Sequence, residues 1–362
     1  MAIYLDDAQR TSLARLARSL TWRTQWPTWA LIVAIYGGWF GVATHARELG
    51  LPLSAGLLAV FGTWYMSLQH ELLHGHPTRW PFVNALLGFA PLAVWFPFRI
   101  YRDSHLLHHD DAHLTHPGRD PESYFVSQQV WLHAGPAIRT LLAFRNTFVG
   151  RLLVGPAFAI AATDAQALGK IKRGDWRDMP AWLAHVTALA ALTVWLQQVC
   201  AIPAWVFIVG VGYGALSLAS VRSFHEHRVA QDPAHRTVIN EAGWCWRLLF
   251  LNNNYHLVHH DLPHVPWFAL RQVYVTSRQQ YIKRSGHFLV KGYSEWLRLY
   301  VFAPVTPPVY GDLSGLIQSN PHASDSSAGK LRVKFMVVVR GGEPREANLP
   351  VTAERQTPRQ AL

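Results

Sequence analysis

Two pairs of long apolar runs constrain this fold more than any other feature of the sequence. The first pair covers residues 27–45 and 51–68, and the second covers residues 181–202 and 204–221. Each run approaches the roughly 20 residues that an α-helix needs to cross a bilayer. The links within the pairs are very short, and the second is little more than Pro203. The sequence therefore predicts an all-α integral membrane protein with four transmembrane helices that form two hairpins.

The composition supports a membrane protein and argues against nucleic-acid binding. Only 15% of the residues are charged, well below the roughly 25% of a typical soluble domain. The formal net charge is +11, but the Lys and Arg residues flank the apolar runs instead of forming one patch, so we expect no nucleic-acid partner. The two cysteines are too few for a disulfide framework or a thiolate metal site.

The apolar run between the two pairs, residues 80–98, differs from the others because it contains Pro81, Asn84, Pro91 and Pro97. We expect a re-entrant or interfacial segment, because broken backbone at membrane depth is tolerated only where protein covers it. The residues before and after this run then lie on the same side of the membrane. Most Lys and Arg residues fall on that side, so the positive-inside rule places it in the cytoplasm. We predict a location in a bacterial inner membrane.

Histidines gather in three clusters that follow the second run, the broken run and a later apolar segment: His70 and His74; His105, His108 and His109; His256, His259 and His260. In a helix, residues three and four apart share a face, so each cluster points several imidazoles in one direction. Imidazole suits zinc, copper, iron and nickel. These histidines exceed what a single four-coordinate zinc uses. The clusters therefore predict two metal ions in a cytoplasmic, histidine-rich cap.

The remaining segments divide the chain into three parts. Residues 1–26 alternate Leu with Arg and predict an amphipathic helix, either on the membrane surface or in solvent. Residues 27–303 form the membrane domain, in which we expect an interfacial helix at 140–162 because Arg145 and Arg151 interrupt the apolar pattern. Residues 304–362 form a tail that we expect to be partly flexible, with a strand-like stretch at 335–339.

A membrane zinc metalloprotease is the main alternative from another class of protein. The stretch His70-Glu71-Leu72-Leu73-His74 matches the H-E-x-x-H pattern, in which Glu71 would act as the general base. A protease needs only one further ligand, so it leaves the other two clusters unused. A metal transporter is a weaker alternative, because transport places polar residues near the bilayer midplane and these histidines lie at the ends of the runs.

The three clusters resemble the histidine boxes of the membrane fatty acid desaturase and hydroxylase superfamily. The family pattern is His-x(3–4)-His followed by two copies of His-x(2–3)-His-His, and it falls on the clusters named above in this order. Boxes interleaved with two apolar hairpins are specific for the superfamily. The resemblance covers roughly residues 27–300, and it says little about the substrate.

The resemblance also implies roles for residues outside the boxes. His227, which follows the last hairpin in the stretch His225-Glu226-His227, matches an additional ligand of the family, and the neighbouring His225 leaves this choice open. We expect a further set of residues to support the ligand histidines or to replace one of them: His76, Asn254, Glu71, Asp103, Asp110 and Asp261.

The implied enzyme is an O₂-dependent oxidoreductase with two non-haem iron ions, held by the box histidines and His227. It removes hydrogen from an unactivated C–H bond of a lipid or fatty acyl substrate. The electrons come from an external donor, such as ferredoxin with its reductase. Desaturation is the expected reaction. Hydroxylation, and decarboxylation of a fatty acid to a terminal alkene, use the same kind of site and stay open.

Overall fold

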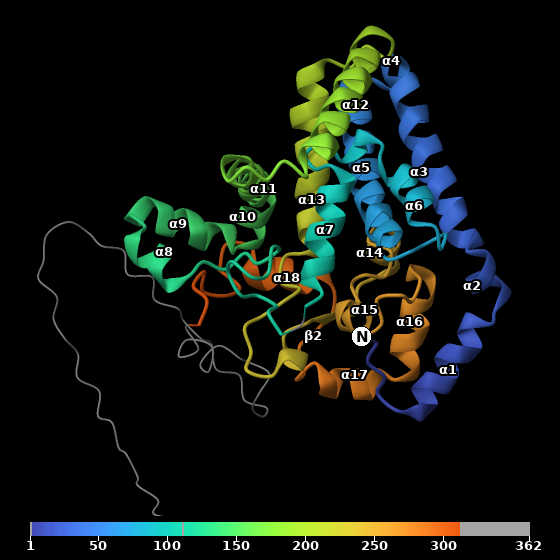
Figure 1. Cartoon of the computed structure of the whole chain (residues 1–362), viewed down its shortest axis with the longest axis vertical. Coiled ribbons are helices and arrows are strands. Elements are labelled where there is room, and N and C mark those ends of the chain that lie inside the picture. The colour runs from blue at the N-terminus through green and yellow to red at the C-terminus, as the bar shows by residue number, and fades with distance from the viewer. Residues whose placement is uncertain (1, 111, 312–362) are drawn as a thin grey trace, which may run out of the picture. The chain divides into compact units, whose positions relative to one another are not determined.

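The computed structural model describes residues 2–110 and 112–311, and these are mostly helical (Figure 1). Three helices among them are long and apolar enough to cross a membrane: α3 (Trp26–Thr44), α5 (Leu51–Leu73) and α12 (Met179–Gln198). The fourth apolar run is π-helical in η2 (Val206–Tyr213) and continues into α13 (Gly214–Arg222). Together they form an apolar helix, Val206–Arg222, which is shorter than the three candidate spans. The helical membrane fold is thus confirmed, whereas the count of four spans stays a prediction.

Helix α5 lies at the centre of the long helices, where it packs against α3, η2 and α13. Its residues Leu58, Tyr65 and Leu68 are completely buried. The helix approaches α13 closely at Gly62, where an added Cβ would lie 3.0 Å from the Cβ of Ala215. The short helix α4 (Ala46–Leu49) links α3 to α5 at the top of Figure 1, and α12 and η2 turn at the same end. The histidine clusters lie at the opposite end of these helices.

Residues 80–98 do not form one membrane-spanning helix. They give α6 (Pro81–Gly88) and the short η1 (Pro91–Ala93), before α7 (Phe98–His108) begins. Side chains of the long helices satisfy the freed carbonyl groups. Tyr36 donates to Leu87 O at 2.6 Å, Tyr65 donates to Ala90 O at 2.8 Å, and Gln69 donates to Gly88 O at 2.8 Å. Such protein partners allow irregular backbone at membrane depth.

Four helices lie between α7 and α12: α8 (Gln128–His133), α9 (Pro136–Arg145), α10 (Phe148–Leu153) and α11 (Gly155–Lys172). In Figure 1 they form the green group beside the long helices. None is among the candidate membrane spans found in the described residues. The prediction of one helix over residues 140–162 is wrong, because Thr147 caps a new helix at α10 and Pro156 lies in the first turn of α11. Ser217 of α13 donates to Leu152 O at 2.6 Å, which ties α10 to the long helices.

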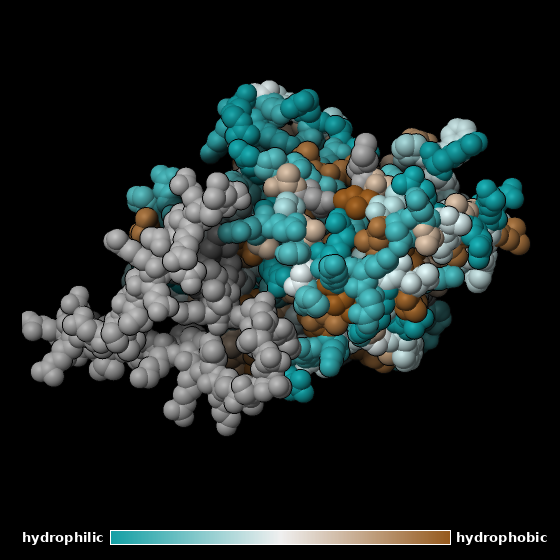
Figure 2. All heavy atoms as spheres, turned by 90° about the horizontal axis from the view of Figure 1, so that it is seen from below, coloured by the Kyte–Doolittle hydropathy of each residue, from teal (hydrophilic) through white to brown (hydrophobic). Residues whose placement is uncertain are grey.

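The described residues after α13 form short elements: η3 (Pro233–His235), β1 (Ile239–Asn240), α14 (Trp244–Leu249), α15 (His256–Asp261), α16 (Trp267–Thr276), α17 (Arg278–Arg284), β2 (Leu289–Val290) and α18 (Tyr293–Tyr300). Strands β1 and β2 pair in parallel, with Ile239 opposite Leu289. Seen from below, where the described residues are visible, this end of the molecule is largely hydrophilic (Figure 2). An end of this character suits contact with water.

The N-terminal segment forms α1 (Asp7–Ala17) and α2 (Leu20–Thr24). Leu13 and Leu16 pack against the hydrophobic core of α15, α16 and α17. The amide of Gln9 donates to the hydroxyl of Tyr281 at 2.7 Å. The helical prediction is therefore confirmed, and one face of α1 is covered by protein. The strand-like stretch at 335–339 lies outside the described residues.

Candidate metal centre

Eight buried histidines form two groups. Within each group, the possible ligand atoms lie within 4.8 Å of one another. The first group is His70, His74, His105 and His259, and the second is His108, His227, His256 and His260. The ends of α5 and α7, helix α15 and the segment after α13 contribute them. Because α5 and α7 approach the same point from the two ends of the broken segment 80–98, both clusters reach one side.

His109 lies beside the first group. Its Nε2 atom is 3.1 Å from Nε2 of His105 and 3.1 Å from Nε2 of His259. Its ring also stacks on that of His260 in the second group, with centroids 4.4 Å apart. All nine histidines that the sequence singled out thus meet in one region, and His109 contacts both groups.

Carboxylates orient two of the α7 histidines. Nδ1 of His105 lies 2.9 Å from Oε1 of Glu122, and Nδ1 of His108 lies 2.9 Å from Oδ1 of Asp120. Burial raises the pKa of Glu122, but His105 and His108 outweigh this effect and lower it, so this carboxylate is ionised. An ionised partner keeps the proton on Nδ1, and Nε2 is left to face the centre. This is the usual way in which proteins prepare a histidine for a metal ion.

An amide and a hydroxyl orient two histidines of the second group. Nδ1 of His256 lies 3.0 Å from Oδ1 of Asn253, and Nδ1 of His227 lies 3.2 Å from Oγ1 of Thr237. The Nε2 atom of His227 is 3.0 Å from Nε2 of His108 and 3.1 Å from Nε2 of His256. The Nε2 atoms of His108, His227 and His256 therefore lie close together.

The electrostatics of these groups favour neutral imidazoles. Burial and then the neighbouring histidines hold the pKa of His227, His256 and His259 well below the ordinary value. His108 is different, because Glu122 and Asp120 outweigh its burial and raise its pKa to about 9. Neutral imidazole is the form that binds metal, so most of these side chains are ready as ligands.

The donor set fits two cations. Closely packed nitrogen lone pairs repel one another unless a cation lies between them. Nε2 of His74 is buried and has no hydrogen-bond partner among the described residues, as expected for an atom reserved for another ligand. Two four-histidine groups, with His109 between them, match nitrogen-preferring transition metals such as iron or zinc.

Several residues that the sequence suggested as supports have other partners. Asp103 is exposed to solvent and pairs with Arg102 at 2.7 Å, so this assignment is corrected. The side chain of Asn254 donates to Asn240 O at 2.6 Å; Asn253 is the asparagine beside the histidines. Its amide also lies 3.4 Å from Nε2 of His70, so Asn253 contacts a histidine of each group.

Of the two neighbouring histidines, His227 occupies the place that the resemblance implied. His225 packs on Phe288, with ring centroids 4.9 Å apart, whereas His227 points into the second group. The carboxylates of Asp261 and Asp110 pair with Arg284 at 2.7 Å and with His113 at 2.6 Å. His76 is buried, and its Nε2 has no hydrogen-bond partner in the described part of the chain; it belongs to neither histidine group.

The sequence reasoning missed Asp120 and Glu122 as partners of histidine. They stand in the stretch Asp120-Pro121-Glu122, just after the second box. Two acidic residues shortly after a His-x-x-His-His motif are the feature of the sequence that could have indicated partners for these histidines. Glu226 was also missed: it pairs with Arg222 at 2.7 Å and lies 3.8 Å from Nδ1 of His256.

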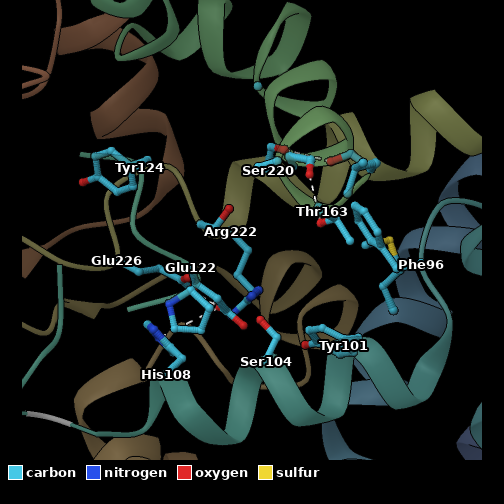
Figure 3. Close-up of a pocket in the computed structure, with 18 of the residues that line it drawn as sticks. Phe96, Tyr101, Ser104, His108, Glu122, Tyr124, Thr163, Ser220, Arg222 and Glu226 are labelled. Atoms are coloured by element: carbon cyan, nitrogen blue, oxygen red, sulfur yellow. Dashed lines mark hydrogen bonds and ion pairs between the residues drawn. The ribbon is translucent and has the colours of Figure 1, made fainter. Parts of the chain in front are cut away.

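A cavity of about 340 Å³ opens beside the histidines, with His70, His108 and His227 in its wall. Figure 3 shows Tyr101 and Ser104 on α7 facing the cavity from one side, with Thr163 and Ser220 on the other. The wall combines apolar side chains such as Met66, Phe96 and Phe158 with charged ones. The cavity therefore suits a molecule with both an apolar and a polar part.

The comparison with protein families decides among the metalloproteins that fit this centre. A family model described as fatty acid desaturase matches residues 48–291. The chain belongs to the fatty acid desaturase family. No curated protein matches the chain. The family match spans all three histidine boxes and His227, so the elements that build the centre all lie within it.

The position of Glu71 does not suit the general base of a zinc protease. Its carboxylate accepts a hydrogen bond from the backbone N–H of Trp267 at 3.0 Å, and the residue is not part of the cavity wall. A general base must reach a metal-bound water, whereas Glu71 anchors the start of α16. The H-E-x-x-H pattern is thus part of a histidine box.

Proposed function

We propose that this protein is a membrane-bound, O₂-dependent diiron oxidoreductase of the desaturase type, acting on a fatty acid or acyl lipid. The observation that carries the proposal is the pair of adjacent four-histidine groups in a chain of the fatty acid desaturase family. Two irons held by these groups would supply the activation of O₂, with electrons from an external donor, for which we propose a ferredoxin-type protein and its reductase. The proposed location is a bacterial inner membrane, with the histidines on the cytoplasmic side.

The residues of this chain have distinct tasks in such a reaction. The histidines of both groups, with His109, would hold the irons, and Asp120, Glu122 and Asn253 fix the orientations of His108, His105 and His256. The cavity beside His70, His108 and His227 holds the substrate. Its apolar wall excludes water and buries methylene groups of the substrate. Each buried methylene group contributes about 0.8 kcal/mol to the free energy of binding.

The test compares lipid and fatty acid profiles of cells that produce the protein with those of cells that produce the His259→Ala variant. A new double bond that depends on His259 supports desaturation. A hydroxylated product or a terminal alkene assigns the reaction to one of those alternatives instead. If purified protein carries zinc and no iron, and its activity is independent of O₂ and a reductant, the proposal is wrong.

A further inference from the structure

Two buried arginines without a carboxylate partner lie in the wall of the substrate cavity. Arg145 is the last residue of α9, and Arg151 belongs to α10. Both are more than nine-tenths buried, with 8% of each residue exposed. Both line the cavity that also contains His70, His108 and His227.

Each guanidinium has N–H groups that no described residue satisfies. Nε of Arg145, and Nε and Nη2 of Arg151, are buried without a hydrogen-bond partner in residues 2–110 and 112–311. The recorded contacts are with a carbonyl and with aromatic faces. Arg145 donates to Tyr124 O and lies 4.8 Å from the Phe158 ring centroid, and Arg151 lies 4.3 Å from that of Tyr124. A buried charge is costly unless it is paired.

The charges of the cavity wall do not balance within the described chain. Three arginines and two glutamates line it. Arg222 pairs with Glu226 at 2.7 Å, and Glu122 contacts His105 at 2.9 Å. Both carboxylates thus have partners, and Arg145 and Arg151 are left facing the cavity. An anion from outside the chain would supply the missing charge and accept the free N–H groups.

The α9–α10 corner holds the two arginines in place. An added Cβ on Gly150 would lie 1.7 Å from Phe144 O, so the two short helices meet more closely than any other residue permits. Asn146, between the arginines, donates to Thr306 O at 3.0 Å. Tyr124, which contacts both guanidinium groups, donates to His227 O at 2.8 Å. The corner is therefore fixed relative to the metal centre.

We propose that Arg145 and Arg151 bind an anionic group of the substrate, a carboxylate or a phosphate, so that the preferred substrate is an amphiphilic anion and not a neutral acyl ester. This inference rests on the proposed function, because it assigns the cavity to the substrate. The two guanidinium groups together match an oxyanion, because arginine donates hydrogen bonds to such a group in a fork geometry. The apolar wall at Phe96 and Phe158 receives the chain attached to the anion.

The test measures binding to the full-length, iron-loaded protein in neutral detergent, by equilibrium dialysis of three probes with the same chain: dodecanoate, dodecyl phosphate and methyl dodecanoate. We expect at least one of the two anions to bind, and to bind more tightly than the ester. Arg151→Met should weaken that binding by about tenfold or more, as the loss of charge-assisted hydrogen bonds implies. The control Arg173→Gln removes the same charge from the exposed end of α11 and should change nothing.

The two anionic probes distinguish a carboxylate from a phosphate, and either one supports the proposal. A second measurement guards against a folding defect. Without ligand, Arg151→Met should raise the melting temperature, because it removes an unpaired buried charge. The inference fails if the ester binds as tightly as both anions, or if Arg151→Met lowers the melting temperature and leaves anion binding intact. Binding needs neither O₂ nor a reductant, so a failed desaturase assay would not affect this result.

Discussion

The Nδ1 atom of His108 lies 2.9 Å from Oδ1 of Asp120, and both side chains are almost completely buried. The same carboxylate accepts hydrogen bonds from the backbone N–H groups of Thr115 and Glu122. One aspartate thus fixes the histidine ring and the loop that carries Glu122. The orientation of the histidines depends on a loop outside the boxes.

Replacement of Asp120 by Asn should weaken metal binding without unfolding the protein. The amide keeps the size of the side chain but removes the negative charge, so it holds the proton on Nδ1 of His108 less strongly than the carboxylate does. We expect the affinity for the metal to fall by about 10- to 100-fold, the usual cost of losing such a partner. Iron retained against a competing chelator measures the effect. Asp103→Asn, on the exposed side of α7, is the matched control, and equal retention in both variants would contradict the assignment.

His227 and His225 should respond differently to substitution. His227→Ala removes a nitrogen from the second group, so we expect a clear loss of bound iron and of activity. His225→Phe should leave the iron content unchanged, because His225 packs against Phe288 and Trp296 and an aromatic ring preserves that contact. The number of iron ions per protein molecule in each variant, measured by mass spectrometry, tests this prediction. The opposite pattern would exchange the roles of the two histidines.

Gly150→Ala should destabilise the protein more than the same change at Gly135. The new methyl group at Gly150 meets the backbone of Phe144, whereas nothing lies within 4 Å at Gly135. Strain of this kind costs about 1–3 kcal/mol. We expect a lower melting temperature and weaker binding of the anionic probe for Gly150→Ala alone. Equal melting temperatures would show that the α9–α10 corner is not tightly packed.

The proposed topology places Glu48 and Gln231 on opposite sides of the membrane. Both positions are exposed. The exposed Cys245 is first replaced by Ser, and Cys200 is buried. In intact cells, a membrane-impermeant thiol reagent should label Glu48→Cys but not Gln231→Cys, and in inverted vesicles the preference should reverse. Labelling of both positions from the same side would rule out this topology.

Local patterns in the sequence were sufficient for the framework of the protein. The length and spacing of the apolar runs predict helical hairpins, because a helix must satisfy its own backbone in lipid. The prolines of residues 80–98 predict the break, and the structure has one there. The three- and four-residue spacing of the boxes puts histidines on common faces. These features depend only on neighbours along the chain.

Only the tertiary structure decided which residues accompany the histidines. Asn253 and Asn254 are adjacent in a turn where Asn252 has a φ of 56°, so helical spacing says nothing about which one faces the metal centre. His227 and His225 both follow the end of α13, and they differ in what their side chains contact: the second histidine group for His227 and Phe288 for His225. Arg145 and Arg151 looked like charges of an interfacial helix in sequence. Their burial without a carboxylate arises because α9 and α10 fold back over the cavity, and such long-range packing leaves no periodic signal in the chain.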